Sequence, residues 1–268
     1  MHFYLFDCGS GPVQAVERDG VLREHRWSAA EGPVGEPGDP LGDPASARLL
    51  APLAPGKIVA IGLNYADHIR ESGAEPPESP LIFAKYPSTV IGPGEAITID
   101  RGLTERVDWE VELGVVIGRR SRNVPEAEAL DAVFGYTVAN DVSARDVQFA
   151  DGQWTRGKSM DTFCPLGPCI VGREEIEDPQ QLSLRTTVNG EEMQSASTSL
   201  MLFSVAELIA FCSASFTLEP GDLLLTGTPW GCGEFMEPKR SLHDGDSVKV
   251  EIGGIGELSN PVVEREGT

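Results

Sequence analysis

The chain has 268 residues, of which 40% are hydrophobic and 24% charged, as is typical of a globular protein with a sizeable core. Its formal net charge of −21 disfavours nucleic acid and anionic membranes as partners, because both require positive charge on the protein. The sequence has no apolar run of membrane-spanning length, and its start, MHFYLFDCGS, is unlike a signal peptide, so we expect a cytoplasmic protein.

The first 55 residues predict a small N-terminal subdomain followed by a connector. The segments FYLFD (3–7) and PVQAVE (12–17) are strand-like. Residues 31–56 are rich in Pro, Gly and Asp, which indicates a loop or linker. We therefore place the domain boundary between residues 55 and 56.

Strands dominate the pattern from residue 57 onward, punctuated by Gly and Pro turns. We expect them at 57–63, 80–85, 96–100, 109–118, 132–141, 169–172, 182–190, 222–228 and 247–258. Two helices are predicted, one over 64–73 with Asn64 as its N-cap and one over 204–215 with Ser204 as its cap. The sequence thus predicts a β-rich α+β fold.

The segment DWEVELGVVIG, residues 108–118, combines a core strand with acidic residues. Side chains alternate along a strand, which places Asp108, Glu110 and Glu112 on one face and apolar residues on the other. Buried carboxylates two residues apart repel each other and lose hydration, so they need solvent, a basic partner or a divalent cation. An edge strand with one wet face is the simpler alternative. We expect Asp108 to be solvated or paired with an Arg.

A second apolar strand, 132–141, ends in Asp141. If the two strands are neighbours, Glu110, Glu112 and Asp141 converge at one end of a sheet. Ligands that are all oxygen suit Mg²⁺ or Mn²⁺. Such an ion would also let a strongly acidic protein receive an anionic substrate.

The segment GLNYADHIRES, residues 62–72, supplies a candidate general base. His68 and Glu71 are three residues apart and so lie on one face of a helical turn. A carboxylate beside an imidazole orients it and raises its basicity. A surface His–Glu pair without function is the commoner meaning of this spacing.

Residues 152–159, GQWTRGKS, match the phosphate-binding pattern GxxxxGK[ST]. The context argues against a nucleotide enzyme, because a P-loop joins a buried strand to a long helix. Here RDVQFAD precedes the motif, and the prolines of MDTFCPLGP follow it. Lys158 remains a candidate cation near the carboxylates.

The five cysteines are Cys8, Cys164, Cys169, Cys212 and Cys232. Their odd number and the lack of a CxxC pair disfavour a disulfide framework or a zinc site. We expect free thiols, with Cys164 and Cys232 as packing residues.

Seven motifs occur in an order that resembles the fumarylacetoacetate hydrolase superfamily, over roughly residues 57–263. They are GLNYADH, KYPSTVIGPG, EVELGVVIG, NDVSARDVQ, GKSMDTFCPLGP, LLTGTPWG and EIGGIGELSN. The resemblance implies a mixed β-roll for residues 56–268, a Mg²⁺ or Mn²⁺ ion and usually a homodimer. Tyr86 and the segment WGCGEFMEP (230–238) depart from the usual family pattern.

The resemblance also assigns roles to individual residues. It implies that Glu110, Glu112 and Asp141 are metal ligands, and that His68 and Glu71 form a dyad on a lid segment. Lys158 resembles a lysine that contacts the substrate or a product oxyanion. Four further positions resemble residues that contact the substrate or lie near the site entrance: Arg145, Gln148, Thr228 and Lys85.

These assignments predict an enzyme that stabilises an enolate of a 2-oxo acid. Our first expectation is hydrolysis of a C–C bond in an acylpyruvate-like 1,3-diketo acid, with the dyad activating water. Decarboxylation of an oxaloacetate-type acid and isomerisation of a 2-hydroxymuconate-type acid are open alternatives on the same residues. A metal-binding scaffold without activity is the alternative outside enzymes.

Overall fold

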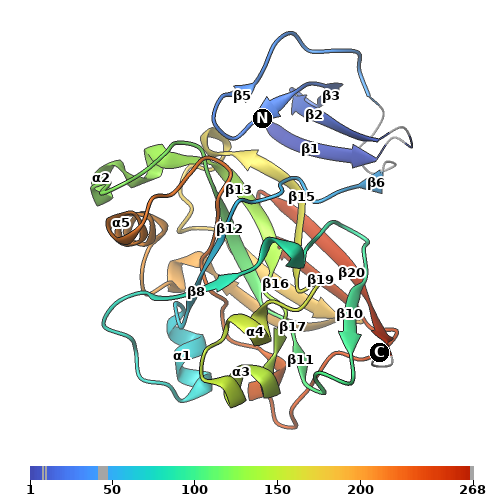
Figure 1. Ribbon diagram of the computed structural model, residues 1–268, viewed down its shortest axis with the longest axis vertical. Coiled ribbons are helices and arrows are strands. Elements are labelled where there is room, and N and C mark those ends of the chain that lie inside the picture. The colour runs from blue at the N-terminus through green and yellow to red at the C-terminus, as the bar shows by residue number, and fades with distance from the viewer. Residues whose placement is uncertain (8, 10, 42–47, 266–268) are drawn as a thin grey trace.

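The computed structural model describes residues 1–7, 9, 11–41 and 48–265 (Figure 1). The largest sheet has 11 strands in the order β3-β2-β1-β15-β13-β12-β18-β7-β8, with β6 paired to β1 and β9 to β15. These strands are β1 (His2–Asp7), β2 (Pro12–Arg18), β3 (Val21–Glu24), β6 (Arg48–Leu49), β7 (Ile58–Gly62), β8 (Leu81–Lys85), β9 (Val90–Ile91), β12 (Val111–Ile117), β13 (Val133–Asn140), β15 (Cys164–Gly172) and β18 (Leu223–Leu225).

A second sheet of five strands has the order β10-β20-β19-β16-β17 and lies against β12, β13 and β15 of the first (Figure 1). Its strands are β10 (Ile97–Asp100), β16 (Ser183–Val188), β17 (Glu191–Ser197), β19 (Ser247–Ile252) and β20 (Gly256–Arg265). Two small pairs complete the strands: β4 (Trp27–Ser28) with β5 (Gly32–Pro33), and β11 (Val107–Asp108) with β14 (Ser143–Ala144). The expected β-rich α+β fold is confirmed.

The N-terminal residues extend the large sheet instead of forming a sheet of their own. Strand β1 pairs with β15 in antiparallel register, with His2 opposite Val171. The segment expected to be a loop, 31–56, contains the short strands β5 and β6. A domain boundary after residue 55 stays a prediction.

Short helices carry several of the candidate residues. They are α1 (Ala66–Ser72), α2 (Glu126–Ala129), α3 (Arg145–Asp151), α4 (Thr155–Lys158) and α5 (Val205–Ser215). The expected cap at Asn64 is wrong, because Tyr65 is the N-cap of α1 and the Asn64 amide donates instead to the carbonyls of Phe203 and Thr226. No helix in these described stretches is long and apolar enough to cross a membrane.

The expected cap of α5 is confirmed. Ser204 Oγ accepts the N–H of Glu207, and the Glu207 carboxylate accepts the N–H of Ser204, which is a complete capping box. Replacing Ser204 by Ala should lower the free energy of unfolding by about 1 kcal/mol, measured by urea denaturation. Ser215→Ala, at the exposed end of the same helix, is the control. Equal stability of the two variants would contradict this role.

Strand β12 lies in the middle of the large sheet, between β13 and β18. Its residues are buried on both faces, so the alternative of an edge strand with one wet face is wrong. The apolar face of β12, with Val111, Leu113 and Val115, belongs to the main hydrophobic core. The carboxylates on the opposite face therefore need partners other than bulk water.

Candidate active site

Three carboxylates meet where β12 and β13 pair. Val111 lies opposite Asn140, and the Asp141 N–H donates to the carbonyl of Glu110, which sets Asp141 beside the start of β12. One oxygen each from Glu110, Glu112 and Asp141 lies within 4.8 Å of the others, and all three side chains are buried. The expected convergence of these residues is confirmed; their role as metal ligands stays a prediction.

Two buried lysines neutralise part of this charge. Lys158 Nζ lies 2.6 Å from Glu110 Oε2 and 2.9 Å from Asp141 Oδ2. Lys85 Nζ lies 2.6 Å from Asp141 Oδ1 and also donates to the carbonyl of Lys158. We expected Lys85 near the site entrance, but its side chain is inaccessible to solvent and lies behind Asp141. It joins Asp141 to the turn that carries Lys158, and it does not line the cavity described below.

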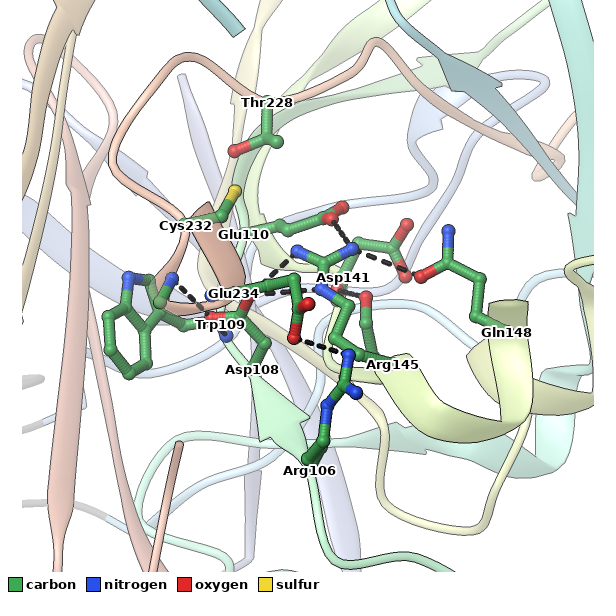
Figure 2. Close-up of polar contacts among 12 residues, drawn as sticks. Arg106, Asp108, Trp109, Glu110, Asp141, Arg145, Gln148, Thr228, Cys232 and Glu234 are labelled. Carbon is green, nitrogen blue, oxygen red and sulfur yellow. Dashed lines mark hydrogen bonds and ion pairs between the residues drawn. The ribbon is translucent and has the colours of Figure 1, made fainter. Parts of the chain in front are cut away.

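Arg145 links the carboxylate cluster to a fourth buried acid (Figure 2). Its Nη1 lies 2.7 Å from Glu110 Oε1, and its Nε donates to Asp108 Oδ2 at 2.9 Å. Nη1 also donates to Gln148 Oε1 at 3.1 Å, one helical turn further along α3. The sequence predicted that Asp108 is either solvated or paired with an arginine. The structure shows the pairing with Arg145, and Asp108 is buried. The amide nitrogen of Gln148 is left to face the cavity as a donor.

The pKa values of Glu110 and Glu112 are shifted in opposite directions. Burial would raise the pKa of Glu110, but Lys158 and Arg145 outweigh it and hold that pKa below its ordinary value. Burial, together with the charges of Asp141 and Glu110, raises the pKa of Glu112 well above its ordinary value. Among the described residues Glu112 forms no ion pair, and its Oε2 accepts only the N–H of Gly227, at 2.8 Å.

Buried acids outnumber buried basic groups around the carboxylate cluster, which suits the binding of a divalent cation. Four buried acids, Asp108, Glu110, Glu112 and Asp141, face three buried cations, Lys85, Arg145 and Lys158. Glu112 is the acid without a basic partner among the described residues, and it lies within 4.8 Å of the other two carboxylates of the cluster. A ligand set made only of carboxylate oxygens suits a hard ion.

The His68–Glu71 dyad lies on α1 at the edge of the same site. His68 Nδ1 is 2.7 Å from Glu71 Oε1, and Glu71 Oε2 accepts the N–H of Gly231 at 2.9 Å. Glu71 is thereby fixed by both its oxygens. It holds the imidazole with its proton on Nδ1, which leaves the Nε2 lone pair to act as a base. No described residue bonds to Nε2.

A cavity of about 190 Å³ brings these groups together. It is lined by Ile61, Gly62, Leu63, His68, Ser72, Ala74, Phe83, Glu110, Glu112, Arg145, Gln148, Phe149, Trp154, Lys158, Thr228 and Phe235. The position of the Trp154 ring in the cavity wall requires a glycine at residue 62, because a Cβ on Gly62 would lie 2.2 Å from that ring. The cavity is lined by both apolar and polar side chains, as small-molecule sites are.

Gln194 is a site residue that the sequence did not reveal. Its Nε2 donates to Thr228 Oγ1 at 2.9 Å, and its Oε1 accepts the N–H of Val111 at 3.0 Å. Because Thr228 accepts this bond, its hydroxyl proton is free to point into the cavity. A single buried amide in the polar segment EEMQSAS (191–197) carries no sequence signal of this role.

The phosphate-binding pattern at 152–159 does not form a P-loop. The motif follows helix α3, not a strand, and its Lys158 ends the single turn α4. Lys158 is buried against Glu110 and Asp141. The nucleotide-enzyme alternative is therefore wrong.

Asp108 joins Arg145 to the loop that faces α1. Besides Arg145 it accepts the N–H groups of Gly233 and Glu234, at 2.8 and 3.1 Å. We predict that Asp108→Asn lowers the free energy of unfolding by ~3–5 kcal/mol, because it removes one of the two carboxylates that neutralise the buried Arg145. The control is Asp151→Asn, which breaks the exposed pair with Arg156 and should change the denaturation curve little. Similar curves for the two variants would contradict the role of Asp108.

The fold and the site together define an enzyme with acid–base groups beside a carboxylate cluster. The family model for the fumarylacetoacetate (FAA) hydrolase C-terminal domain matches residues 57–263. The chain belongs to the fumarylacetoacetate hydrolase superfamily, as its motifs predicted.

The chain is similar to several proteins over most of its length. Protein Rv2993c of Mycobacterium tuberculosis is 46% identical over 265 residues, covering 92% of this chain and 96% of that protein. Oxaloacetate tautomerase fahd2, mitochondrial, of Xenopus laevis is 48% identical over 218 residues, covering 80% of this chain and 68% of that protein. The crystal structure of 5-carboxymethyl-2-hydroxymuconate delta-isomerase from Mycobacterium smegmatis is 42% identical, covers 99% of this chain and 100% of that chain, and superposes with a TM-score of 0.85.

Proposed function

We propose that this protein is a metal-dependent isomerase that interconverts the keto and enol forms of a 2-oxo dicarboxylic acid. The observation that carries the proposal is the His68–Glu71 dyad, which borders the same cavity as Glu110 and Glu112. Two similar proteins bear the names of a tautomerase and an isomerase, which supports this reaction class. Our first expectation from sequence, C–C hydrolysis, becomes the second candidate.

Glu110, Glu112 and Asp141 would hold Mg²⁺ or Mn²⁺. When bound, the ion would supply Lewis acidity that stabilises negative charge on the 2-oxygen of the substrate. Lys158 and Lys85 orient this ligand set through their contacts with Glu110 and Asp141. We expect activity to disappear with EDTA and return with either ion.

His68 is the group that moves the proton. In the keto-to-enol direction its Nε2 takes a proton from C3, and the electron pair of the C–H bond becomes the C2–C3 double bond. The carbonyl π electrons move to the 2-oxygen, which takes a proton from solvent to give the enol. In the reverse direction the imidazolium returns its Nε2 proton to C3, and the 2-hydroxyl of the enol releases its proton to solvent. Glu71 stabilises the imidazolium in both directions, because it accepts the Nδ1 proton at 2.7 Å.

Neutral donors around the cavity suit the substrate carboxylates. The Thr228 hydroxyl has a free proton because Gln194 donates to its oxygen. The Gln148 amide nitrogen is free because Arg145 occupies its oxygen. Both side chains line the cavity, and neither adds charge that must be compensated. The apolar wall of Phe83 and Trp154 would pack against the carbon chain of the substrate.

Hydrolysis of an acylpyruvate remains the second candidate because the same dyad can activate water. Nε2 of His68 would take a proton from water, whose oxygen attacks the distal carbonyl. The ammonium of Lys158 also lines the cavity, where it would stabilise a second oxyanion. Decarboxylation of an oxaloacetate-type acid needs no attacking water and would leave the dyad without a part in bond cleavage.

Product analysis by NMR separates the three reactions. We would supply oxaloacetate enriched in its enol, keto oxaloacetate and acetylpyruvate separately, each with Mg²⁺ and again with EDTA. The proposal predicts metal-dependent conversion of the enol to the keto form, faster than in buffer. Acetate and pyruvate from acetylpyruvate would favour hydrolysis instead, and pyruvate with CO₂ from oxaloacetate would favour decarboxylation. No metal-dependent reaction of any of these substrates would contradict the proposal.

A further inference from the structure

Cys232 lies against the dyad, although the sequence predicts it only as a packing residue. Its Sγ is 3.8 Å from His68 Nδ1, the same nitrogen that is 2.7 Å from Glu71 Oε1. One potential ligand atom each from His68, Glu71 and Cys232 lies within 4.8 Å of the others. Figure 2 shows Cys232 beside the network of Glu110 and Arg145, on the loop that also carries Thr228.

Two separate elements hold these three side chains in place. His68 and Glu71 belong to α1, and Cys232 precedes the 3-10 turn η6 (Gly233–Phe235). The N–H of Gly231, the neighbour of Cys232, donates to Glu71 Oε2. Hydrogen bonds of this kind orient metal ligands, and here one joins the two elements. Asp108 fixes the other side of the turn by accepting the N–H of Gly233.

The chemistry of the set differs from that of the carboxylate cluster. Imidazole nitrogen, carboxylate oxygen and thiolate sulfur together suit zinc, whereas oxygens alone suit magnesium. Tetrahedral zinc with ordinary bond lengths separates a sulfur and a nitrogen ligand by about 3.5 Å, close to the observed 3.8 Å. The His68–Glu71 contact would have to widen by ~0.6 Å for both to bind one ion.

We propose that Cys232, His68 and Glu71 form a second metal site, which binds Zn²⁺ or another thiophilic divalent ion and switches the dyad off. Binding replaces the Cys232 S–H bond by a sulfur–metal bond and releases one proton to solvent. The ion also takes the lone pair of His68 Nδ1, so the proton of the neutral imidazole must reside on Nε2. Solvent carries it there, because His68 lines the cavity.

Inhibition follows from this change of tautomer and rests on the proposed function. With the proton on Nε2 and the ion on Nδ1, the ring has no lone pair left to accept a proton from a substrate. Magnesium at the carboxylate cluster cannot compete for the sulfur ligand. Zinc should therefore inhibit even when Mg²⁺ is saturating. Without the ion, Cys232 is no nucleophile, because burial raises the pKa of its thiol well above its ordinary value.

Cadmium, a spectroscopic substitute for zinc, tests the site without any need for turnover. The protein is saturated with Mg²⁺ and titrated with Cd²⁺, and the ultraviolet absorption of the sulfur–cadmium bond is recorded. The wild type should develop this absorption up to one equivalent. Cys232→Ser should lose it, and zinc affinity should fall by more than ~10-fold. Cys212→Ser is the matched control, a buried cysteine on α5 whose pKa is raised by burial alone.

The proposed metal site would be contradicted if the wild type did not develop the absorption, or if the Cys232→Ser variant still developed it. His68→Ala offers a second check, since it removes a ligand while leaving the thiol, and should weaken zinc binding by a similar factor. Inhibition is then measured separately, as the zinc concentration that halves the rate in wild type and in Cys232→Ser. If the wild type shows the cadmium absorption but catalyses no reaction, the second metal site is supported and the proposed function is contradicted. Equal zinc inhibition of both proteins would overturn the switch.

Discussion

Replacing His68 by Gln is expected to lower the rate of enol–keto conversion by ~10²–10⁴-fold, the usual contribution of a positioned acid–base group. Glutamine keeps a polar side chain on α1 but has no nitrogen lone pair that can take a proton. The ligands proposed for Mg²⁺ or Mn²⁺ come from β12, the residue before it and the residue after β13, and none of them belongs to α1. The loss should therefore appear in kcat, with metal affinity unchanged.

Initial rates at saturating metal, with a parallel calorimetric titration of Mn²⁺, measure both quantities. Glu71→Gln should retain more activity than His68→Gln, because it removes the group that orients the base and leaves the base itself. Arg70→Ala, an exposed substitution on the same helix that does not line the cavity, is the control for a general disturbance of α1. A His68→Gln enzyme with more than a tenth of the wild-type rate would contradict the assigned role.

Replacing Glu112 by Gln should abolish metal binding and stabilise the metal-free protein. Glu112 is buried beside Asp141 and Glu110, which raises its pKa well above its ordinary value. A glutamine has the same shape, carries no charge, and its oxygen can still accept the N–H of Gly227. We expect the free energy of unfolding in EDTA at pH 8 to increase by about 1 kcal/mol or more.

The pH dependence has a definite sign. A carboxyl whose pKa is higher in the folded than in the unfolded protein binds its proton more tightly when folded. The metal-free wild type should therefore lose stability as the pH rises from the ordinary pKa of 4.5 to the raised value, while Glu112→Gln lacks this loss. Metal binding to the wild type should release this proton and tighten as the pH rises.

Denaturation curves in EDTA from pH 4 to pH 9, with Mn²⁺ titrations beside them, measure both effects. Glu126→Gln, an exposed substitution on α2, is the matched control. If Glu112→Gln still bound Mn²⁺ with wild-type affinity, Glu112 would not be a ligand. If the free energy of unfolding of Glu112→Gln equalled that of the wild type at every pH, burial of the Glu112 carboxylate would not cost stability.

Much of the core could be predicted because periodicity is a local property. The alternation in residues 108–118 predicted one apolar face and one acidic face. The apolar face of β12 lies in the main core, but of the three acids only Glu112 is on this strand, since Asp108 belongs to β11 and Glu110 lies between the two. Convergence with Asp141 needed one further assumption, the pairing of β12 with β13, which the structure confirms. The cap at Ser204 was likewise predicted from local sequence, and the structure adds Glu207 as the second half of a capping box.

Contacts between distant segments could not be predicted from these patterns. Lys85 was expected near the entrance, but the pairing of β8 with β7 directs it behind Asp141. Asn64 resembled a helix cap, yet its amide joins Phe203 and Thr226, more than 130 residues away in the chain. Helices α3 and α4 are too short to show a periodic signal.

The same limit applies to residues that act through others. Gln194 orients Thr228 from a strand that carries no catalytic motif. Cys232 reaches His68 across 164 residues, although the spacing of the cysteines in the chain disfavoured a metal site. Such roles depend on which loops contact each other in the fold. The order of motifs along the chain does not specify these contacts.

The position at which a single deuterium enters the product tests proton transfer by His68 most directly. The enol of oxaloacetate is converted in D₂O with Mg²⁺, and the keto acid is reduced at once to malate for NMR. A proton delivered by His68 reaches one face of the enol, so we predict label in one of the two positions at C3. EDTA should give both positions equally, at the rate in buffer, and His68→Gln should lose the preference for one position. An enzyme-accelerated reaction of the wild type with label in both positions, or no acceleration at all, would contradict proton transfer by His68.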